Sequence, residues 1–312
     1  MANELPHTAP MVKIAAQTYS LYQECSTDLP GTLQALSRMG FSSVEPPLEP
    51  FATPEGMPNN GRTNRLWSRG MLKTAAGLLP ELGMEVASVH IGVNFGCYAL
   101  PLDVIRENIL SLHDTYGITD FVASGAFRTR ERTLHWAALA QRISDAIRPY
   151  GCRILYHNHD DEFQKVDDRG EAVEAIDLFL RSTSEEVLLQ VDVGWAALAT
   201  DTPQFLRKNA NRVGSLHLKD FYPGYQRYAR TEMPAELFAP IGQGVVPIKE
   251  VISMLDQFPN FGGTVIIDQD KSNAILSDLE VGYQNFVHML SYRKDDKSGM
   301  SYASNSSRVM ME

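Results

Sequence analysis

Pairs of polar, ionisable residues close four of the apolar runs in the second half of this chain. Residues two apart on a strand point to the same face, so each pair predicts two side chains that share one surface. Buried imidazoles and carboxylates are costly unless they are paired or bind a metal, so a cluster of them suggests a site. The pairs are His157 with His159, Gln190 with Asp192, His217 with Lys219, and Asp268 with Asp270.

Three earlier apolar runs also end in polar residues, at Gln17, Glu45 and His90. Taken singly, such a residue is more often a helix cap or a solvated loop residue than a functional group. Six or more at the same end of neighbouring strands are hard to explain by capping alone. We therefore interpret these strand ends as one functional site.

Two His and two Asp in this set form a mixed nitrogen and oxygen donor group. Such a group suits Mn²⁺, Co²⁺, Zn²⁺ or Fe²⁺ better than Ca²⁺, which prefers oxygen ligands. Spacing alone is a weak signal, because ligands from four separate strands have no compact motif. We expect one divalent cation, with Mn²⁺ as first choice and Co²⁺, Zn²⁺, Fe²⁺ and Mg²⁺ as alternatives.

Alternating strand and helix patterns must position these residues. We predict strands at 12–16, 41–45, 85–90, 119–124, 153–159, 187–192, 213–219 and 264–268. We predict helices at 28–39, 66–82, 101–116, 132–150, 171–181, 203–208, 247–257 and 275–292. Eight strand-helix units favour an α/β fold of the (β/α)₈ TIM barrel type, with its active site at the carboxyl ends of the strands. An open doubly wound sheet is disfavoured, because no Gly-rich phosphate loop follows the first strand.

Length and composition fit one soluble globular domain. The chain has 312 residues, of which 44% are hydrophobic and 21% charged. We expect a single catalytic domain over residues 1–294 and a flexible tail over 295–312. Its net charge of −10 would repel a phosphate backbone, so we expect no nucleic-acid partner. We see no signal peptide or apolar run that could span a membrane, and only three scattered Cys, so we expect a cytoplasmic protein that does not bind membranes.

Five sequence motifs occur in order at the expected strands. They read LYHNHDDEF, QVDVGWAALATD, RVGSLHLKDF, APIGQGV and TVIIDQD. From about residue 12 to 292 the chain resembles the sugar phosphate isomerase/epimerase family, the xylose isomerase-like TIM barrels that include inosose dehydratase and ketose 3-epimerases. The resemblance implies a divalent cation at the ends of strands five to eight. The implied ligands are His157, Asp192, His217 and Asp268.

Two of these ligands depart from the pattern of ketohexose 3-epimerases. Those enzymes carry Glu at the positions of His157 and Asp268, and the two Glu act both as ligands and as the acid/base pair. The present chain therefore lacks the symmetric pair of carboxylates that epimerisation from two faces uses. The identity of the base stays open between Asp268 and His159.

The resemblance implies an enzyme that acts on a keto-sugar or cyclitol substrate. It would abstract an α-proton and pass through a metal-stabilised enediolate, giving isomerisation or epimerisation. The alternative is a β-eliminating dehydratase or a 3-keto-glycoside lyase. Lys219 would hold a substrate oxygen, and His159 could instead orient a metal ligand. The other expected substrate-binding residues are Gln17, Glu45, His90 and Trp195.

Two other classes of protein remain as distant alternatives. A nuclease related to apurinic-site endonucleases would need more His and acidic ligands, and the eight His of this chain leave too few. A non-catalytic sugar-binding barrel would need no metal. The Arg-rich segment 127–132 could hold a phosphate, although such a run is more often a solvated helix start. The sequence does not identify the substrate, and it does not determine whether the chain forms a homo-oligomer.

Overall fold

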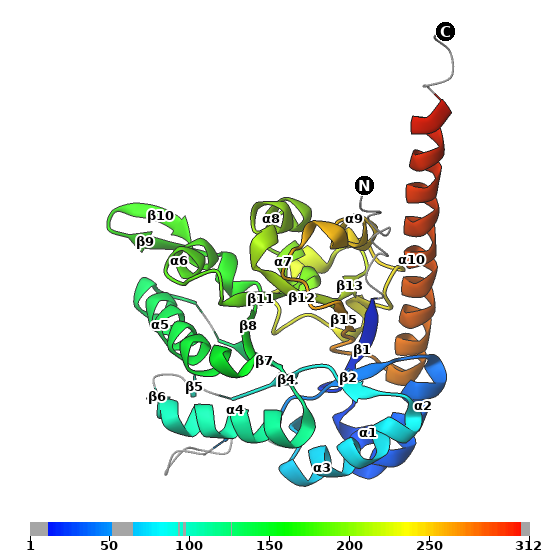
Figure 1. Ribbon diagram of the computed structural model, residues 1–312. Helices are drawn as coiled ribbons and strands as arrows, with labels where there is room; N and C mark the ends of the chain where they lie inside the picture. The colour runs from blue at the N-terminus through cyan, green and yellow to red at the C-terminus, as the bar shows by residue number, and fades with distance from the viewer. Residues whose placement is uncertain (1–11, 52–64, 93, 96–97, 126, 307–312) are drawn as a thin grey trace, which may run out of the picture.

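Nine parallel strands form the central sheet in the computed structural model of this protein (Figure 1), which describes residues 12–51, 65–92, 94–95, 98–125 and 127–306. Their order is β3-β2-β1-β15-β12-β11-β8-β7-β4. Their bounds are β1 Lys13–Gln17, β2 Ser43–Glu45, β3 Glu85–Val86, β4 Val89–His90, β7 Asp120–Ser124, β8 Arg153–His157, β11 Leu188–Asp192, β12 Val213–Leu218 and β15 Thr264–Ile267.

Strands β3 and β4 are the two halves of the single strand predicted at 85–90. β3 pairs with β2, whereas β4 pairs with β7 at the other end of the strand order. A parallel bridge between Pro47 and His90 joins the chain after β2 to β4. The His90 N–H donates to the carbonyl of Pro46 at 3.1 Å. The sheet is thereby nearly closed, and the predicted (β/α)₈ barrel is confirmed.

Helices follow the strands and surround the sheet (Figure 1). Capping residues explain both ends of α2. The Asp28 side chain accepts from the Gly31 N–H at its start, and Gly40 ends the helix with φ of 105°. The bounds are α2 Leu29–Met39, α3 Arg69–Leu78, α4 Leu102–Tyr116, α5 Arg130–Ile147, α6 Ala175–Arg181, α8 Thr202–Lys208, α9 Ile248–Ser253 and α10 Ile275–Ser306.

The helix predicted at 171–181 is partly wrong. Its first residues form β10 (Glu171–Glu174), which pairs antiparallel with β9 (Lys165–Asp168). The turn between them places Arg169 and Gly170 at positive φ, and the Asp167 carboxylate accepts from the Gly170 N–H at 2.6 Å. Asp-rich turn chemistry therefore prevailed over the helical pattern, and only α6 remains of the predicted helix.

Several short elements of the structure had no counterpart in the sequence prediction. They are α1 Tyr22–Thr27, α7 Val193–Ala197, the hairpin of β5 Asn94–Phe95 with β6 Tyr98–Ala99, and the hairpin of β13 Asp220–Phe221 with β14 Phe238–Ala239. Helix α10 continues beyond its predicted end at residue 292 into the expected tail. The flexibility of that tail stays a prediction. Among the described residues, no helix combines the length and apolar character that a membrane crossing requires.

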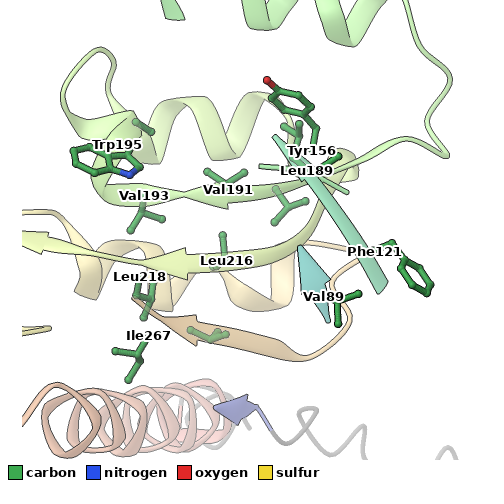
Figure 2. Packing of buried hydrophobic residues seen from close by; sticks show 14 of the residues in the cluster. Val89, Phe121, Tyr156, Leu189, Val191, Val193, Trp195, Leu216, Leu218 and Ile267 are labelled. Atoms are coloured by element: carbon green, nitrogen blue, oxygen red, sulfur yellow. The ribbon is translucent and has the colours of Figure 1, made fainter. Parts of the chain in front are cut away.

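The barrel strands bury apolar side chains on both faces. Alternate residues such as Leu189, Val191 and Leu216 belong to the large core cluster that the strands share with the helices (Figure 2). Leu155 and Leu188 face the other way and form a small separate cluster with Val122. Two residues further along the same strands, the positions on this face are His157 and Gln190, which are polar. The face that Leu155 and Leu188 share therefore continues into the candidate site.

Candidate metal centre

The four predicted ligands lie at the carboxyl ends of neighbouring strands. In the strand register Gln190 pairs with His157, and Asp192 pairs with His217. The Asp268 N–H donates to the carbonyl of Leu218 at 3.0 Å, which aligns the end of β15 with that of β12. Register and strand order together therefore bring four side chains, distant in sequence, to one end of the barrel.

These four side chains are almost fully buried and close to one another. The His157 Nε2 lies 3.9 Å from Asp192 Oδ2, and the His217 Nδ1 lies 3.4 Å from Asp268 Oδ2. Asp192, His217 and Asp268 each offer one ligand atom within 4.8 Å of the other two. The geometry is compact enough for one cation to reach all three.

Lys219 lies among the carboxylates of this cluster. Its Nζ is 3.0 Å from Asp192 Oδ2, 3.0 Å from Asp268 Oδ2 and 2.5 Å from Asp270 Oδ2. Burial disfavours a charged amine, but these three carboxylates outweigh it and raise the pKa of Lys219 above its ordinary value. The ammonium group balances part of the buried negative charge. It also lies 4.3 Å from the centroid of the Trp195 ring.

Three buried atoms of the cluster form no hydrogen bond among the described residues. They are the His217 Nδ1, the Asp268 Oδ1 and the Asp192 Oδ2, which has an ion-pair contact with the Lys219 ammonium at 3.0 Å. A buried polar atom without a hydrogen bond costs free energy and needs an explanation. A divalent cation bound between the imidazole and the carboxylates would satisfy all three atoms, and the mixed donor set has the chemistry that such a cation prefers. The residues present therefore fit the cation.

A second group of three imidazoles, from His90, His157 and His217, also has nitrogen atoms within 4.8 Å of one another. Two of these residues use the nitrogen in hydrogen bonds with Glu45. The His90 Nε2 lies 2.8 Å and the His217 Nε2 2.6 Å from its Oε1. Because these nitrogen atoms already have partners, the side of His217 that faces the aspartates is the better place for a cation.

The imidazoles at the site differ in charge. Burial, together with neighbouring cationic groups, lowers the pKa of His157 and His159 well below the ordinary value, so both are neutral at pH 7. For His217 burial acts in the same direction, but Glu45 and Asp268 overcome it and raise its pKa to about 10. A cation that binds His217 must therefore displace a proton from the ring.

The predicted substrate-binding residues lie at the same end of the barrel. Gln17 donates from Nε2 to Glu45 Oε1 at 2.9 Å, and Glu45 has no exposed surface. The His90 side chain is 18% exposed and is the most accessible of the set. Trp195 is buried against Phe221 and Phe238, which agrees with a packing role. Their contacts with substrate stay predictions.

Sequence reasoning missed three polar groups around the site. Ser88 donates to Glu45 from the break between β3 and β4, inside the strand predicted at 85–90, where only His90 at its end was predicted as a site residue. Glu162 is fully buried and accepts from the Tyr156 hydroxyl at 2.7 Å and from the His159 N–H at 2.8 Å. The motif LYHNHDDEF contained Glu162 and was the available signal. Arg230 comes from a loop without periodicity, which gave no signal.

Arg230 pairs with the acidic residues that follow β8. Its Nε donates to Asp160 Oδ1 at 2.7 Å, and its Nη2 lies 3.4 Å from Asp161 Oδ2. Arg128 of the segment 127–132 reaches the same Asp161 at 3.5 Å, and Arg130 bonds Asp168 at 2.6 Å. Acidic groups thus engage these arginines, and α5 starts at Arg130 as a helix start predicts.

Comparison with known proteins identifies a family and several similar folds. The family model described as xylose isomerase-like TIM barrel matches residues 33–284. A sugar phosphate isomerase/epimerase from Parabacteroides distasonis is 18% identical, with a TM-score of 0.68 and coverage of 90% of this chain and 94% of that one. A D-tagatose 3-epimerase-like protein is 14% identical, with a TM-score of 0.59 and coverage of 90% and 99%.

A third solved structure is a probable 3-DHS dehydratase from Bacillus anthracis, which is 10% identical, with a TM-score of 0.63 and coverage of 88% and 98%. No curated protein matches the chain. At such identities the likeness to solved structures shows the fold alone. The family match covers most of the barrel, from α2 into α10. The chain therefore belongs to the family of xylose isomerase-like TIM barrels.

Proposed function

We propose that this protein is a divalent-metal-dependent enzyme of the sugar isomerase/epimerase type, acting on a keto-sugar or cyclitol. One observation carries the proposal. Two imidazoles and two carboxylates from four adjacent strands meet at the carboxyl end of the barrel, where the His217 Nδ1 and Asp268 Oδ1 are buried and form no hydrogen bond with any residue that the structure describes. In barrels of this kind the active site lies at that end.

His157, Asp192, His217 and Asp268 would hold the cation, with Mn²⁺ as our first choice. A bound cation would supply Lewis-acid polarisation of the substrate carbonyl. Lys219 already contacts three carboxylates. Its charge would therefore balance the anionic ligands and would be available to a substrate oxygen only where one of these contacts is released.

We assign the proton transfer to His159. Its imidazole is neutral, is only partly buried by the surrounding chain, and lies edge-on to His157 with ring centroids 5.1 Å apart. The hydrogen bond from its backbone N–H to Glu162 fixes the start of the loop that carries it. Asp268, the other candidate, lies between His217 and Lys219 and is less free to accept a proton.

A single base on one face of the substrate favours some reactions over others. It can return a proton to a neighbouring carbon or promote loss of a β-substituent, but it cannot easily invert a centre, which needs a group on each face. β-Elimination by a dehydratase or lyase is therefore the second candidate function. The observation that favours it is the absence of a paired carboxylate at the position of His157.

Metal analysis combined with isotope exchange tests the proposal. The purified protein should contain about one divalent cation per chain, and chelation should remove its activity. The reconstituted protein is then incubated in D₂O with ketoses, inososes and 3-keto-glycosides. Deuterium at an α-carbon is expected even without net turnover. A protein that binds no cation, or that exchanges no α-proton in the whole panel, would overturn the proposal.

A further inference from the structure

Glu45 lies at the centre of the polar network behind the candidate metal centre. It comes from the end of β2 and has no exposed surface. Five side chains place a nitrogen or hydroxyl oxygen within hydrogen-bond distance of its two carboxylate oxygens. They are Gln17, His90 and His217 at Oε1, and Ser88 and Gln190 at Oε2. Both oxygens of Glu45 therefore accept hydrogen bonds from neighbouring side chains.

A carboxylate can only accept hydrogen bonds, so its neighbours must donate. The His217 Nε2, 2.6 Å from Glu45 Oε1, therefore carries a proton. The other ring nitrogen, Nδ1, lies on the opposite side of the imidazole, 3.4 Å from Asp268 Oδ2, and forms no hydrogen bond in the described part of the chain. Glu45 thus determines which nitrogen of His217 can bind a cation.

The same constraint reaches His157 through Gln190. Gln190 donates from Nε2 to Glu45 Oε2 at 2.6 Å, so its carbonyl oxygen must face the other way. That oxygen lies 3.0 Å from the His157 Nδ1, which must therefore be the protonated nitrogen. The His157 Nε2 is left with its lone pair, 3.9 Å from Asp192 Oδ2.

His90 is consistent with this assignment. Its Nε2 lies 2.8 Å from Glu45 Oε1 and 3.1 Å from Gln190 Oε1. Both of these atoms are acceptors, so one N–H of His90 satisfies both. The hydrogen bonds of Glu45 and Gln190 are thus consistent with one assignment of donors and acceptors, and Glu45 defines it.

We propose that Glu45 is a positioning residue that sets the tautomers of both ligand imidazoles, so that the His217 Nδ1 and the His157 Nε2 face the two aspartates. This inference rests on the proposed function, because the two unprotonated nitrogen atoms would bind the divalent cation. Acceptors behind a ligand imidazole orient its ring and increase its basicity. Here one carboxylate would do so for two imidazoles from two strands, directly for one and through an amide for the other.

The test compares wild type with Glu45→Gln, which keeps the shape but turns an N–H₂ group toward donors. Titration calorimetry with Mn²⁺ and Zn²⁺ should show affinity reduced about 10- to 100-fold, the range for partners of metal ligands. Nitrogen-15 spectra of the diamagnetic zinc form should show His217 bound through Nδ1 and His157 through Nε2 in wild type. In Glu45→Gln the two rings should lose these assignments.

Two further variants separate positioning from folding. Gln190→Met removes the relay from Glu45 to His157, and with it the contact of Gln190 to His90, but keeps the Glu45 contact of His217. It should therefore disturb the tautomer of His157 and leave that of His217 unchanged. Asp120→Asn breaks an ion pair at the opposite end of the barrel, and it should lower stability without changing metal affinity. Circular dichroism checks that each variant is folded. If Glu45→Gln does not fold, the tautomer of His157 in Gln190→Met still tests the inference.

The possible results are distinct. Wild-type affinity in Glu45→Gln, or a zinc form with His217 bound through Nε2, would overturn the role of Glu45 while the metal proposal stands. A wild type that binds no cation would overturn the proposed function instead. In that case the metal-free spectrum still decides the inference, because His157 must be protonated at Nδ1 in wild type and must lose that preference in Gln190→Met.

Discussion

The charged side chains at the two ends of the barrel differ in how far their hydrogen bonds are satisfied. At the amino end of β7 and β8, Arg153 donates from Nε to Asp120 Oδ1 at 2.7 Å and from Nη1 to the carbonyl of Asn260 at 2.9 Å. At the carboxyl end, the buried Asp192 and Asp268 lie together with Lys219, and the His217 Nδ1 and Asp268 Oδ1 form no hydrogen bond within the described chain.

The difference separates stability from function. A charge pair whose hydrogen bonds are satisfied inside the protein needs nothing else and holds two strands in register. A cluster with unpaired atoms is an unfavourable arrangement that the rest of the fold must stabilise, and such arrangements concentrate at functional sites. The comparison predicts that changes at the carboxyl end alter binding and catalysis, whereas changes at the amino end alter stability.

The largest effect is expected from removing a metal ligand. His217→Ala and Asp192→Ala should each abolish activity and reduce metal affinity by more than about 100-fold, beyond the range for residues that act behind the ligands. Elemental analysis and calorimetry measure the metal, and circular dichroism checks the fold. Full metal occupancy in His217→Ala would show that the ligand assignment is wrong.

The stability of the protein should depend on pH through Glu162, which is buried near the carboxyl end of the barrel. Burial is the largest cause that raises the pKa of its carboxyl group to about 7 in the folded protein. The folded state then holds the proton more tightly than the unfolded state, for which the pKa is about 4.3. This contribution is full below that value and is lost as pH rises through 7, a change on the order of 3 kcal/mol.

Urea unfolding at pH 5 and pH 8 measures this contribution. The wild type should lose stability relative to Glu162→Gln over that interval, because Gln does not titrate. A constant difference between the two proteins would indicate that Glu162 titrates in the folded state as it does in the unfolded chain.

The opposite end of the barrel should respond through stability alone. Asp120→Asn leaves Arg153 without its charged partner, and the pair is partly exposed, so we expect a loss of about 1–2 kcal/mol. Urea denaturation measures the loss. Metal affinity and turnover of the remaining folded protein should equal those of wild type, and a change in either would break the proposed separation of the two ends.

Introducing a pair of carboxylates at the carboxyl end tests whether the wild-type site has a base on only one face of the substrate. The double variant His157→Glu with Asp268→Glu should gain modest epimerase activity on D-fructose and D-tagatose, provided that it still binds metal, because a base would then stand on each face. Wild type should show little of this activity. Efficient C3 epimerisation by wild type would show that another residue already supplies the second face.

No effect is expected from nucleic acid. A net charge of −10 opposes binding to a phosphate backbone, so DNA should not bind measurably at physiological salt. Fluorescence anisotropy with an abasic-site duplex measures the binding, and a gel assay measures cleavage. Cleavage above background would favour a nuclease and contradict the sugar-enzyme proposal.

Most of the fold could be predicted from the sequence, because local patterns encode it. Apolar runs that alternate with helical periodicity predicted each barrel strand near its observed place, and the helix predicted at 28–39 is observed as α2. The same runs showed which polar residues close each strand. Because parallel strands end on the same side of a barrel, these residues were expected to meet, and the structure brings them together.

What the sequence alone determined is therefore the set of side chains at the carboxyl end and the barrel that carries them. The tertiary structure decided which of them face one another. It placed Lys219 between Asp192 and Asp268, and it surrounded Glu45 with donors from strands far apart in sequence. Hydrogen bonds and charge pairs form between side chains brought close by closure of the sheet, and no local pattern records that distance.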